Sequence, residues 1–345
     1  MQDIRNLDSG HLLEFLKSNQ EPSFRAKQIS EWLWKKNVSS FEQMKNIPAS
    51  LQKKLAENFS ISKLNLIEEQ QSTDKTIKCK LQLHDGNHIE MALIPSGKRT
   101  TVCISTQVGC ALKCAFCATG TMGFVRNLST FEMYEQVFLA NNLAQQKYNN
   151  KISNIVIMGM GEPLLNLENV CDAISWITKN EGLAMSPSRI TLSTVGIKDK
   201  IRDLADKNLG INLAISLHSA NEIKRKQLIP VGENNSLSDI SKALIYYHAK
   251  TNQRITIEYL LLADVNDSLQ DAQELALFCR NFPVKVNIIE YNQHSNNLFK
   301  CSSRERRDEF VEFLMSKNMI TQIRNSRGKD IGAACGQLVV KSLNF

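Results

Sequence analysis

The sequence has no run of apolar residues that approaches the roughly 18 needed for a membrane-spanning helix. Its first ten residues, MQDIRNLDSG, include acids and no apolar core, so they do not resemble a secretory signal peptide. Seven prolines and fifteen glycines among 345 residues, without repeats or low-complexity tracts, exclude collagen-like and disordered chains. We therefore expect a globular protein of the cytoplasm that makes no contact with membranes.

Neither sign of charge dominates the composition. The 42 basic and 35 acidic side chains leave a formal charge of +7, which suits a polyanionic partner without requiring one. Nine cysteines are an odd number, and a chain of this length buries enough core to fold without disulfides. In a reducing compartment, cysteines are structural, catalytic or metal-binding, and their spacing must decide which.

The first 60 residues carry apolar side chains at helical spacing and show no strand pattern. They predict a small helical domain at 1–60, which is either a bundle that packs only its own core or an accessory domain that binds RNA. Residues 76–95 then alternate between apolar and polar side chains, a pattern typical of a β-hairpin. We expect this hairpin to lie in a linker, residues 61–95, that joins the helical domain to the rest of the chain.

From about residue 100, predicted strands and helices alternate. The six predicted strands of the core lie at residues 101–106, 154–158, 189–193, 212–217, 255–260 and 286–291. The predicted helices lie at residues 130–147, 167–180, 197–208, 236–250, 268–281 and 303–318, and a late strand lies at 320–324. Strands that alternate with helices form parallel sheets. Because six units are too few for an eight-fold barrel, we expect an α/β core at 96–328, either a six-stranded partial barrel or a doubly wound sheet.

Polar and glycine-rich residues follow the predicted strands directly. In parallel α/β folds, active sites are built at the carboxyl ends of the strands. The loops that carry these residues are therefore expected to meet on one face of the core.

Cys110, Cys114 and Cys117 form a C-x3-C-x2-C pattern within a glycine-rich loop. A [4Fe–4S] cluster has four irons, so three thiolates leave one iron open for another ligand. A structural zinc ion needs a fourth ligand, usually from a second cysteine pair, and no suitably spaced residue supplies it. We expect these cysteines to bind a [4Fe–4S] cluster, with a zinc site and a set of buried structural cysteines as the alternatives.

Two other motifs are expected in the same site. Met158–Pro163 reads MGMGEP and fails as a dinucleotide-binding fingerprint because the third glycine is missing. Within it, Gly161 allows a ligand to approach the backbone, and the Glu162 carboxylate can face a cationic amino group. Near the end of the chain, Cys335 is flanked by small residues, a context atypical of a buried structural thiol.

The cysteine loop resembles the signature of the radical S-adenosylmethionine superfamily, in which the open iron binds the cofactor and the fold is a partial (β/α)6 barrel. Phe116, before the last cysteine, also matches. Six segments resemble, more specifically, the Cfr/RlmN family of RNA methyltransferases: CISTQVGCALKCAFCATG, MGMGEPLLN, RITLSTVG, AISLHSA, LLADVNDS and RGKDIGAACGQL. The resemblance covers the whole chain and implies that a C-terminal segment, residues 329–345, carries a catalytic cysteine.

The resemblance also implies a reaction, the methylation of carbon-2 of adenine in 23S ribosomal RNA and in transfer RNA. One S-adenosylmethionine would methylate Cys335, and a second would yield the radical that removes a hydrogen from that methyl group. The resulting methylene radical would add to adenine and join protein to RNA. Cys103 matches the cysteine that breaks this link through a transient disulfide with Cys335. Glu90 matches the family's proposed proton acceptor, and an outward-facing hairpin carboxylate is the alternative for it.

The residues expected to contact S-adenosylmethionine come from the same motifs. They are Gly161, Glu162, Ser193, Ser216, Leu217, His218 and Asn292. For His218 the alternative is a core histidine whose hydrogen bonds are satisfied.

Basic residues flank the cysteine loop and gather near the C-terminus, where residues 300–329 carry eight basic and four acidic side chains. These residues are Lys98, Arg99, Lys113, Arg126, Lys300, Arg304, Arg306, Arg307, Lys317, Arg324, Arg327 and Lys329. Such a surplus predicts salt-dependent contact with RNA phosphates, and a solvated helix face is the alternative.

The resemblance further implies a reducing electron donor such as flavodoxin or ferredoxin, and a monomeric enzyme. Three other functions stay open. The first is a Cfr-type enzyme that methylates carbon-8 of adenine. The second is a non-catalytic RNA-binding protein that uses the three cysteines for zinc. The third is another radical enzyme, such as a glycyl-radical activase, which has no evident use for Cys335.

Overall fold

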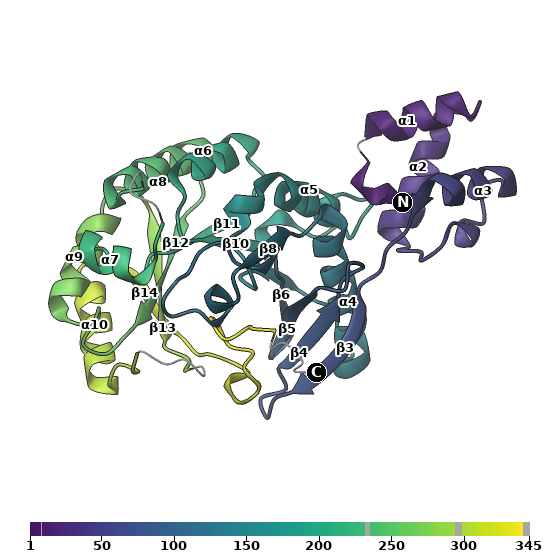
Figure 1. The fold of residues 1–345 in the computed structure, drawn as a ribbon. Helices are drawn as coiled ribbons and strands as arrows, with labels where there is room; N and C mark the ends of the chain where they lie inside the picture. Colours follow the sequence, from purple (N-terminus) through teal and green to yellow (C-terminus); the bar gives the residue numbers. More distant parts are fainter. Residues whose placement is uncertain (8, 232–234, 294–298, 341–345) are drawn as a thin grey trace.

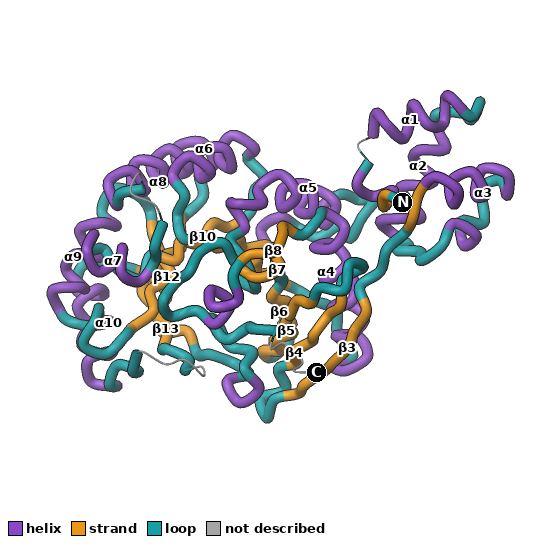
Figure 2. The backbone as a smooth tube through the Cα atoms, in the orientation of Figure 1, coloured by secondary structure: helices purple, strands orange, loops and turns teal. Residues whose placement is uncertain are grey.

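The computed structural model describes residues 1–7, 9–231, 235–293 and 299–340, so the end of the predicted C-terminal segment lies outside the described residues. A helical head projects from a larger body built on one curved sheet (Figures 1 and 2). None of the described helices is long and apolar enough to cross a membrane.

The head contains three helices, α1 (Ser9–Ser18), α2 (Phe24–Ser30) and α3 (Ala49–Asn58), as the helical spacing predicted. A short parallel pair of strands, β1 (Gln2–Asp3) and β2 (Phe59–Ser60), brings the two ends of the head together. The apolar side chains that set the helical spacing are buried, among them Leu16, Ile29, Met44, Leu51 and Leu55.

The body is built on a ten-stranded sheet in the order β14-β13-β12-β11-β10-β9-β6-β5-β4-β3. Its six central strands run parallel: β6 (Arg99–Cys103), β9 (Asn154–Ile157), β10 (Ile190–Thr194), β11 (Asn212–Ser216), β12 (Ile255–Leu261) and β13 (Val284–Glu290). The late strand β14 (Ile320–Arg324) extends this parallel set at one edge. Because each strand lies beside its predecessor, the order never reverses as it would in a doubly wound sheet. The predicted partial (β/α)6 barrel is confirmed.

The helices that follow these strands cover the outer face of the barrel (Figure 1). They are α4 (Thr130–Tyr148), α5 (Leu167–Thr178), α6 (Lys198–Lys207), α8 (Leu237–Thr251), α9 (Leu269–Cys279) and α10 (Arg304–Ser316). All six were predicted, with shifts of a few residues at their ends.

Several elements were not predicted, including the short strands β1 and β2 of the head. Helix α7 (Glu222–Leu228) is short and begins at an Asn221 cap inside a polar stretch. Strand β3 (Asn65–Gln71) is an edge strand rich in Glu and Gln, and such residues blunt an exposed edge while weakening the strand pattern. The small pair β7 (Gln107–Gly109) and β8 (Phe124–Asn127) brackets the cysteine loop and is too short to show a period.

The predicted hairpin is present as β4 (Ile77–Gln82) and β5 (His88–Ser96). Its strands also extend the main sheet, since β5 pairs antiparallel with β6 and places Ala92 opposite Cys103. The hairpin is therefore part of the wall of the barrel as well as the connection to the head.

Aromatic rings join the head to the body. Trp34 of the head stacks on Trp176 of α5, with ring centroids 4.4 Å apart, and meets Tyr134 of α4 edge to face at 5.1 Å. The Tyr134 hydroxyl also donates a hydrogen bond to the Trp34 carbonyl. Aromatic pairs of this kind add to the free energy of burying their surface.

Buried charges reinforce the same joint. Lys63 lies 3.0 Å from Glu135 of α4, and Arg5 lies 3.8 Å from the same carboxylate and 2.8 Å from Asp3. The side chains of Arg5 and Glu135 are each 1% exposed. Burial raises the pKa of Glu135, and the two cations oppose that shift. The head is thus held against α4 by ion pairs to Glu135, a carboxylate that is shielded from water.

Replacing Glu135 with Ala should leave Arg5 and Lys63 without their shared partner in a buried site. We expect the free energy of unfolding to fall by about 3–5 kcal/mol, as is usual when one partner of a buried ion pair is removed. Urea denaturation measures the loss. Glu168→Ala, which breaks an exposed pair with Lys207, is the control and should cost less than about 1 kcal/mol. Equal losses in the two variants would show that the joint does not depend on this pair.

Candidate active site

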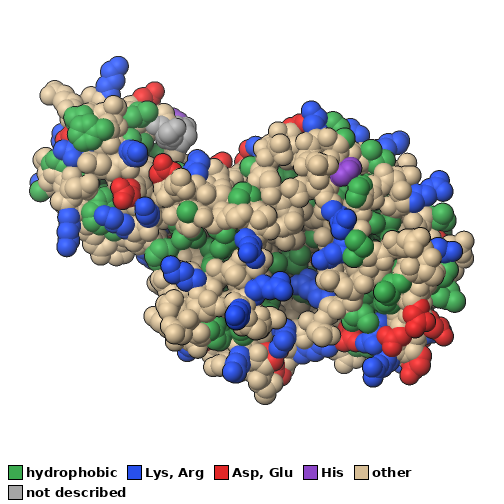
Figure 3. All heavy atoms as spheres, turned by 180° about the vertical axis from the view of Figure 1, so that it is seen from behind, with side chains coloured by type: hydrophobic (Ala, Val, Ile, Leu, Met, Phe, Trp, Pro, Cys, Tyr) green, Lys and Arg blue, Asp and Glu red, His purple; other side chains and the backbone are tan. Residues whose placement is uncertain are grey.

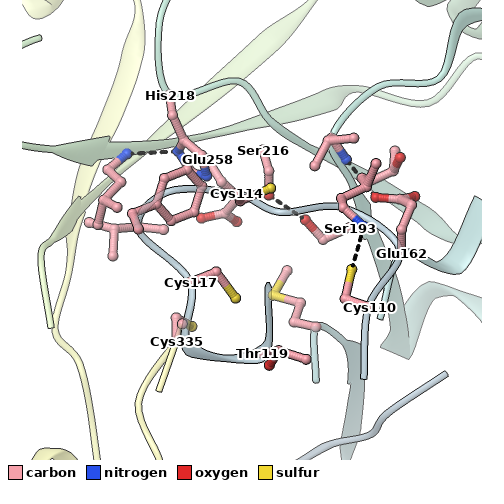
Figure 4. A pocket seen from close by; sticks show the side chains of 18 of the residues that line it. Cys110, Cys114, Cys117, Thr119, Glu162, Ser193, Ser216, His218, Glu258 and Cys335 are labelled. Atoms are coloured by element: carbon pink, nitrogen blue, oxygen red, sulfur yellow. Dashed lines mark hydrogen bonds between the residues drawn. The ribbon is translucent and has the colours of Figure 1, made fainter. Parts of the chain in front are cut away.

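A cavity opens at the carboxyl ends of the parallel strands, where the predicted loops meet. It brings together the three spaced cysteines, the MGMGEP loop, polar residues of β10, β11 and β12, and Cys335 (Figure 4). Its lining includes Cys110, Cys114, Cys117, Gly161, Glu162, Ser193, Ser216, His218, Glu258, Arg324 and Cys335.

The loop between β7 and β8 places the three cysteine side chains in this cavity. Gly109 has a φ of +72°, and a Cβ there would lie 1.8 Å from the carbonyl oxygen of Gly123, so only glycine fits. The Cys110 amide donates to that same carbonyl at 2.8 Å and closes the loop. Figure 4 shows the sulfurs of Cys110, Cys114 and Cys117 facing the interior of the pocket.

The donor set fits an iron–sulfur cluster. A structural zinc ion takes four ligands around a single point, and this loop supplies three thiolates. A cluster instead binds each thiolate to a separate iron. Burial raises the pKa of the Cys110 thiol to about 11, and a bound metal would stabilise the thiolate against this shift.

Both carboxylate oxygens of Glu162 accept backbone hydrogen bonds. Oε1 accepts from the Leu164 amide at 3.0 Å, and Oε2 accepts from the Val195 amide at 2.9 Å. Burial raises the pKa of Glu162, and these hydrogen bonds oppose the shift. The carboxylate therefore ties the loop after β9 to the loop after β10, in addition to facing the cavity.

Gly161 is held at a φ of +103° against Gln107, where a Cβ would meet the Gln107 side chain at 2.6 Å. Ser193 and Ser216 face each other from adjacent strands, with hydroxyl oxygens 3.2 Å apart. These residues lie in the cavity, as the motifs predicted.

His218 combines both interpretations given to it from the sequence. Its Nδ1 accepts a hydrogen bond from the Leu260 amide at 3.0 Å, and burial together with Arg225 lowers its pKa to about 3, so the ring is neutral. Its ring packs edge to face on Phe116 at 4.6 Å and lines the cavity. The side chain is thus satisfied and also forms part of the pocket wall.

Two expected cofactor contacts do not line this cavity. Leu217 is fully buried in the main core, so its side chain points away. Asn292 donates a hydrogen bond from Nδ2 to the Cys335 carbonyl at 3.3 Å, and its buried Oδ1 has no hydrogen-bond partner among the residues that the structure describes.

Cys103 and Cys335 line a second cavity that adjoins the first and shares Cys117 with it. All nine cysteines are free thiols, so the predicted transient disulfide is not formed in this structure. Burial and the neighbouring Cys335 raise the pKa of the Cys103 thiol to about 12, while Arg324 acts in the opposite direction.

Glu90 does not face outward, and the alternative of an exposed hairpin carboxylate is wrong. The residue is 5% exposed, lies 3.4 Å from the Lys78 ammonium and accepts a hydrogen bond from the Val339 amide at 3.0 Å. Burial raises the pKa of Glu90, and Lys78 opposes this. Glu90 lines neither cavity; it lies beneath the segment that carries Cys335.

Sequence reasoning missed Glu258 as part of the pocket and assigned Arg324 only to a basic surface. Glu258 faces the cavity from β12 and lies 3.5 Å from the guanidinium of Arg324, which lines both cavities. The signal for Glu258 was present, because it is an acid inside the apolar run ITIEYLL. Such a residue in a buried strand needs a partner or a ligand.

Most of the predicted basic surface is paired with carboxylates. Arg126 lies 2.8 Å from Glu132, and Arg307 lies 2.6 Å from Glu290. Figure 3 shows Lys and Arg side chains around a hollow on one face, and Arg324 and Arg327 line the second cavity. The exposed cations of the predicted set include Lys98, Arg99, Lys113, Lys300 and Lys317, and also Arg304, Arg306, Arg327 and Lys329, each of which lies within 4.0 Å of a carboxylate.

Comparison with known proteins agrees with this geometry. Residues 104–276 match the family model "Radical SAM superfamily", and residues 2–61 match "Ribosomal RNA large subunit methyltransferase N-terminal domain". The chain is 42% identical to the "Dual-specificity RNA methyltransferase RlmN" of Campylobacter hominis, covering 99% of this chain and 98% of the relative. It is 45% identical to the "Probable dual-specificity RNA methyltransferase RlmN" of Cytophaga hutchinsonii, covering 99% and 93%.

Among solved structures, a radical SAM methyltransferase from Sphaerobacter thermophilus superposes with a TM-score of 0.90 at 37% identity. The match covers 98% of this chain and 99% of that one. The similarity therefore includes the head, the barrel and the C-terminal segment.

Replacing Cys114 with Ala should remove one iron ligand and prevent assembly of the cluster. The native enzyme, reconstituted without oxygen, should hold about four irons per chain and absorb light at about 400 nm. The variant should lose most of this iron and most of this absorbance. Cys301→Ala is the control, because Cys301 is exposed and lies outside both cavities. Full iron content in the Cys114 variant would refute the ligand assignment.

Proposed function

The chain belongs to the RlmN family of radical S-adenosylmethionine RNA methyltransferases, and we propose that it methylates carbon-2 of adenine in 23S ribosomal RNA and in transfer RNA. The family's cofactors are a [4Fe–4S] cluster and S-adenosylmethionine. One observation carries the proposal: Cys335 lies in the same cavity as the three cluster cysteines, with Cys103 lining the adjoining one. A methyltransferase that transferred its methyl group directly would have no need of a fourth and fifth cysteine there.

The proposal solves a chemical problem. Carbon-2 of adenine is electrophilic and does not attack a sulfonium methyl group, whereas a carbon radical adds to it. When bound, the cluster and S-adenosylmethionine supply a methyl group and a deoxyadenosyl radical. Cys335 receives the methyl group on its sulfur, loses a hydrogen from it, and carries the methylene carbon to adenine. The base must leave its stack to reach this buried site, as base-modifying enzymes generally require.

Two residues complete the reaction in this proposal. Glu90 accepts the proton that carbon-2 loses, which its place beneath the Cys335 segment supports, and the one unpaired electron of the adduct would return to the bound cluster. Cys103 then attacks the Cys335 sulfur as a thiolate, so that a disulfide forms as the bond from sulfur to the methylene carbon breaks. The released methylene carbon takes up a proton and becomes the methyl group of the RNA.

The other residues that line the cavity are assigned to the binding of S-adenosylmethionine. Gly161, Glu162, Ser193, Ser216 and His218 hold S-adenosylmethionine from the walls of the cavity, supported by their places in its lining. Leu217 contacts S-adenosylmethionine through its backbone. Asn292 positions Cys335 by donating a hydrogen bond from its side-chain amide to the Cys335 carbonyl.

We assign residues 1–60 to RNA binding, 61–95 to the connecting hairpin, 96–328 to the radical core and 329–345 to the catalytic C-terminal segment. The names of the relatives support RNA as the partner. The enzyme would act as a monomer in the cytoplasm, with flavodoxin or ferredoxin as the reductant. Exposed cations such as Lys113 would contact the phosphates of the RNA.

Nucleoside mass spectrometry tests the proposal directly. RNA from a strain that lacks the gene should lose 2-methyladenosine, and purified holoenzyme should restore it. Loss of 8-methyladenosine with 2-methyladenosine intact would favour the Cfr-type alternative and refute the proposed position.

Replacing Cys103 with Ala should trap the covalent link between protein and RNA, because no thiolate remains to break it. Denaturing gels of single-turnover reactions should show a shifted protein–RNA species that the native enzyme does not accumulate. Cys335→Ala should form neither this species nor methylated RNA. Full RNA methylation by Cys335→Ala would contradict the mechanism.

The pH dependence tests Glu90. Burial raises the pKa of Glu90 and Lys78 lowers it, so Lys78→Met should raise that pKa further. Because only the ionised carboxylate accepts a proton, the acid limb of the pH–rate profile for RNA methylation should move to higher pH. Lys78→Arg keeps the charge and should retain the native profile. An unshifted profile in Lys78→Met would argue against Glu90 as the acceptor.

A further inference from the structure

The segment that carries Cys335 crosses the mouth of the barrel from one edge of the sheet to the other. It leaves β14 at one edge and reaches the antiparallel strands β3, β4 and β5 at the opposite edge (Figure 1). We refer to residues 325–340 as the strap. The hydrogen bonds at its two ends determine where Cys335 lies.

The strap is held at its start by the turn between β3 and β4, residues 72–76. The Gly328 amide donates to Asp74 Oδ2 at 2.9 Å. Asp330 accepts at both oxygens, from the Ser72 hydroxyl at 2.6 Å and from the Thr73 amide at 3.2 Å. These contacts join residues more than 250 positions apart in the sequence.

The turn is prepared for this contact by its own hydrogen bonds. Asp74 Oδ1 accepts from the Thr76 amide at 2.9 Å, which leaves Oδ2 for the strap. Ser72 Oγ accepts from the Asp74 amide at 3.2 Å while it donates to Asp330. Burial opposes ionisation of Asp74, but hydrogen bonds from Thr76, Gly328 and Ser72 outweigh it and lower its pKa to about 2. The acceptor is therefore charged throughout the working pH range.

The fit at Gly328 is close. Its φ is +65°, and a Cβ there would lie 2.8 Å from both the Thr76 Cγ2 and the Ala333 Cβ. Ala333 in turn packs against Ala92 and Cys103. Any larger residue at position 328 must push the strap off the turn or away from Cys103.

Beyond Cys335, the strap is held by the cysteine loop. The Ala118 amide donates to the Gly336 carbonyl at 2.8 Å, and the Thr119 hydroxyl donates to the Leu338 carbonyl at 2.6 Å. Asn292 also donates to the Cys335 carbonyl, and the Val339 amide donates to Glu90. Cys335 thus lies between the β3–β4 turn, which holds the start of the strap, and the cysteine loop and Glu90, which hold its end.

We propose that the β3–β4 turn is a clasp for the strap, and that Asp74 and Asp330 are positioning residues that set the location of the Cys335 sulfur. The proposal deepens the proposed function and rests on it, because in that reaction one sulfur must meet a methyl donor, an adenine and the Cys103 thiolate in turn. Displacing the sulfur by about 1 Å would slow each of these three steps considerably.

Gly328→Ala tests the clasp against a matched control. Gly97, in the turn between β5 and β6, has a similar φ of +58° but nothing within 4 Å of its would-be Cβ, so Gly97→Ala imposes the backbone strain without the clash. In holoenzyme, trypsin cleavage after Arg327 and Lys329 should be about tenfold faster in Gly328→Ala than in the native chain, since cleavage follows the population of the open strap. Gly97→Ala should be cleaved at the native rate. Equal cleavage of the two variants would overturn the clasp.

A double-mutant cycle on Ser72→Ala and Asp330→Ala separates the effect of the Ser72–Asp330 hydrogen bond from a general loss of stability. We expect each single variant to slow methylation of Cys335 by about tenfold. The double variant should be slowed by clearly less than the product of the two effects, because both singles remove the contact between Ser72 and Asp330, while the bond from Thr73 is lost only with Asp330 and the bond from Asp74 only with Ser72. Mass spectrometry of the Cys335 peptide measures the rate, and Asp203→Ala, an exposed ion-paired carboxylate on α6, should leave it unchanged. Additive losses would overturn the proposal.

The two proposals fail in different ways. If Cys335 of native holoenzyme is never methylated, the proposed function is wrong, while the trypsin comparison still decides whether the clasp exists. If Cys335 is methylated normally in every clasp variant, the proposed function stands and the clasp is wrong.

Discussion

The site depends on one close approach of backbone to backbone. Gly109 and Gly123 touch where the cysteine loop closes, at a distance that leaves no space for any side chain on Gly109. Because the loop closes there, three cysteines within eight residues face one cavity instead of spreading along an extended chain. The same loop then donates hydrogen bonds from Ala118 and Thr119 to the strap, so the closure that positions the cluster ligands also holds the strap just beyond Cys335.

Buried carboxylates are the second recurring element. Glu162, Glu90 and Glu135 lie at three junctions: between two strand loops, between the hairpin and the strap, and between the head and α4. At each junction burial raises the carboxyl pKa, and backbone amides or lysine ammonium groups from a second segment oppose it. A carboxylate that needs donors from two segments holds those segments together, since separating them would leave the charge unpaired.

The sequence predicted what local patterns encode. Alternating strands and helices predicted a parallel α/β core, with a partial barrel and a doubly wound sheet both open, and the spacing of Cys110, Cys114 and Cys117 predicted a metal-binding loop. Both predictions rest on properties of neighbouring residues. The inward orientation of Glu90 was not predictable, since it depends on which face of β5 the strap covers. The pairing of Arg126 and Arg307 was missed for a similar reason: their partners Asp85, Glu132 and Glu290 lie on other elements. The contact of Ser72 with Asp330 has no local signature in the sequence.

The joint between head and body has a consequence for substrate choice. Stacked tryptophans and a shared buried carboxylate attach the head to α4 and α5, and so set its position relative to the cavity. In the proposed function, an RNA bound by both the head and the cavity would span a distance that this joint sets, with its reactive base unstacked at the cavity. Two RNAs of unrelated sequence would then need to share a shape and not a sequence.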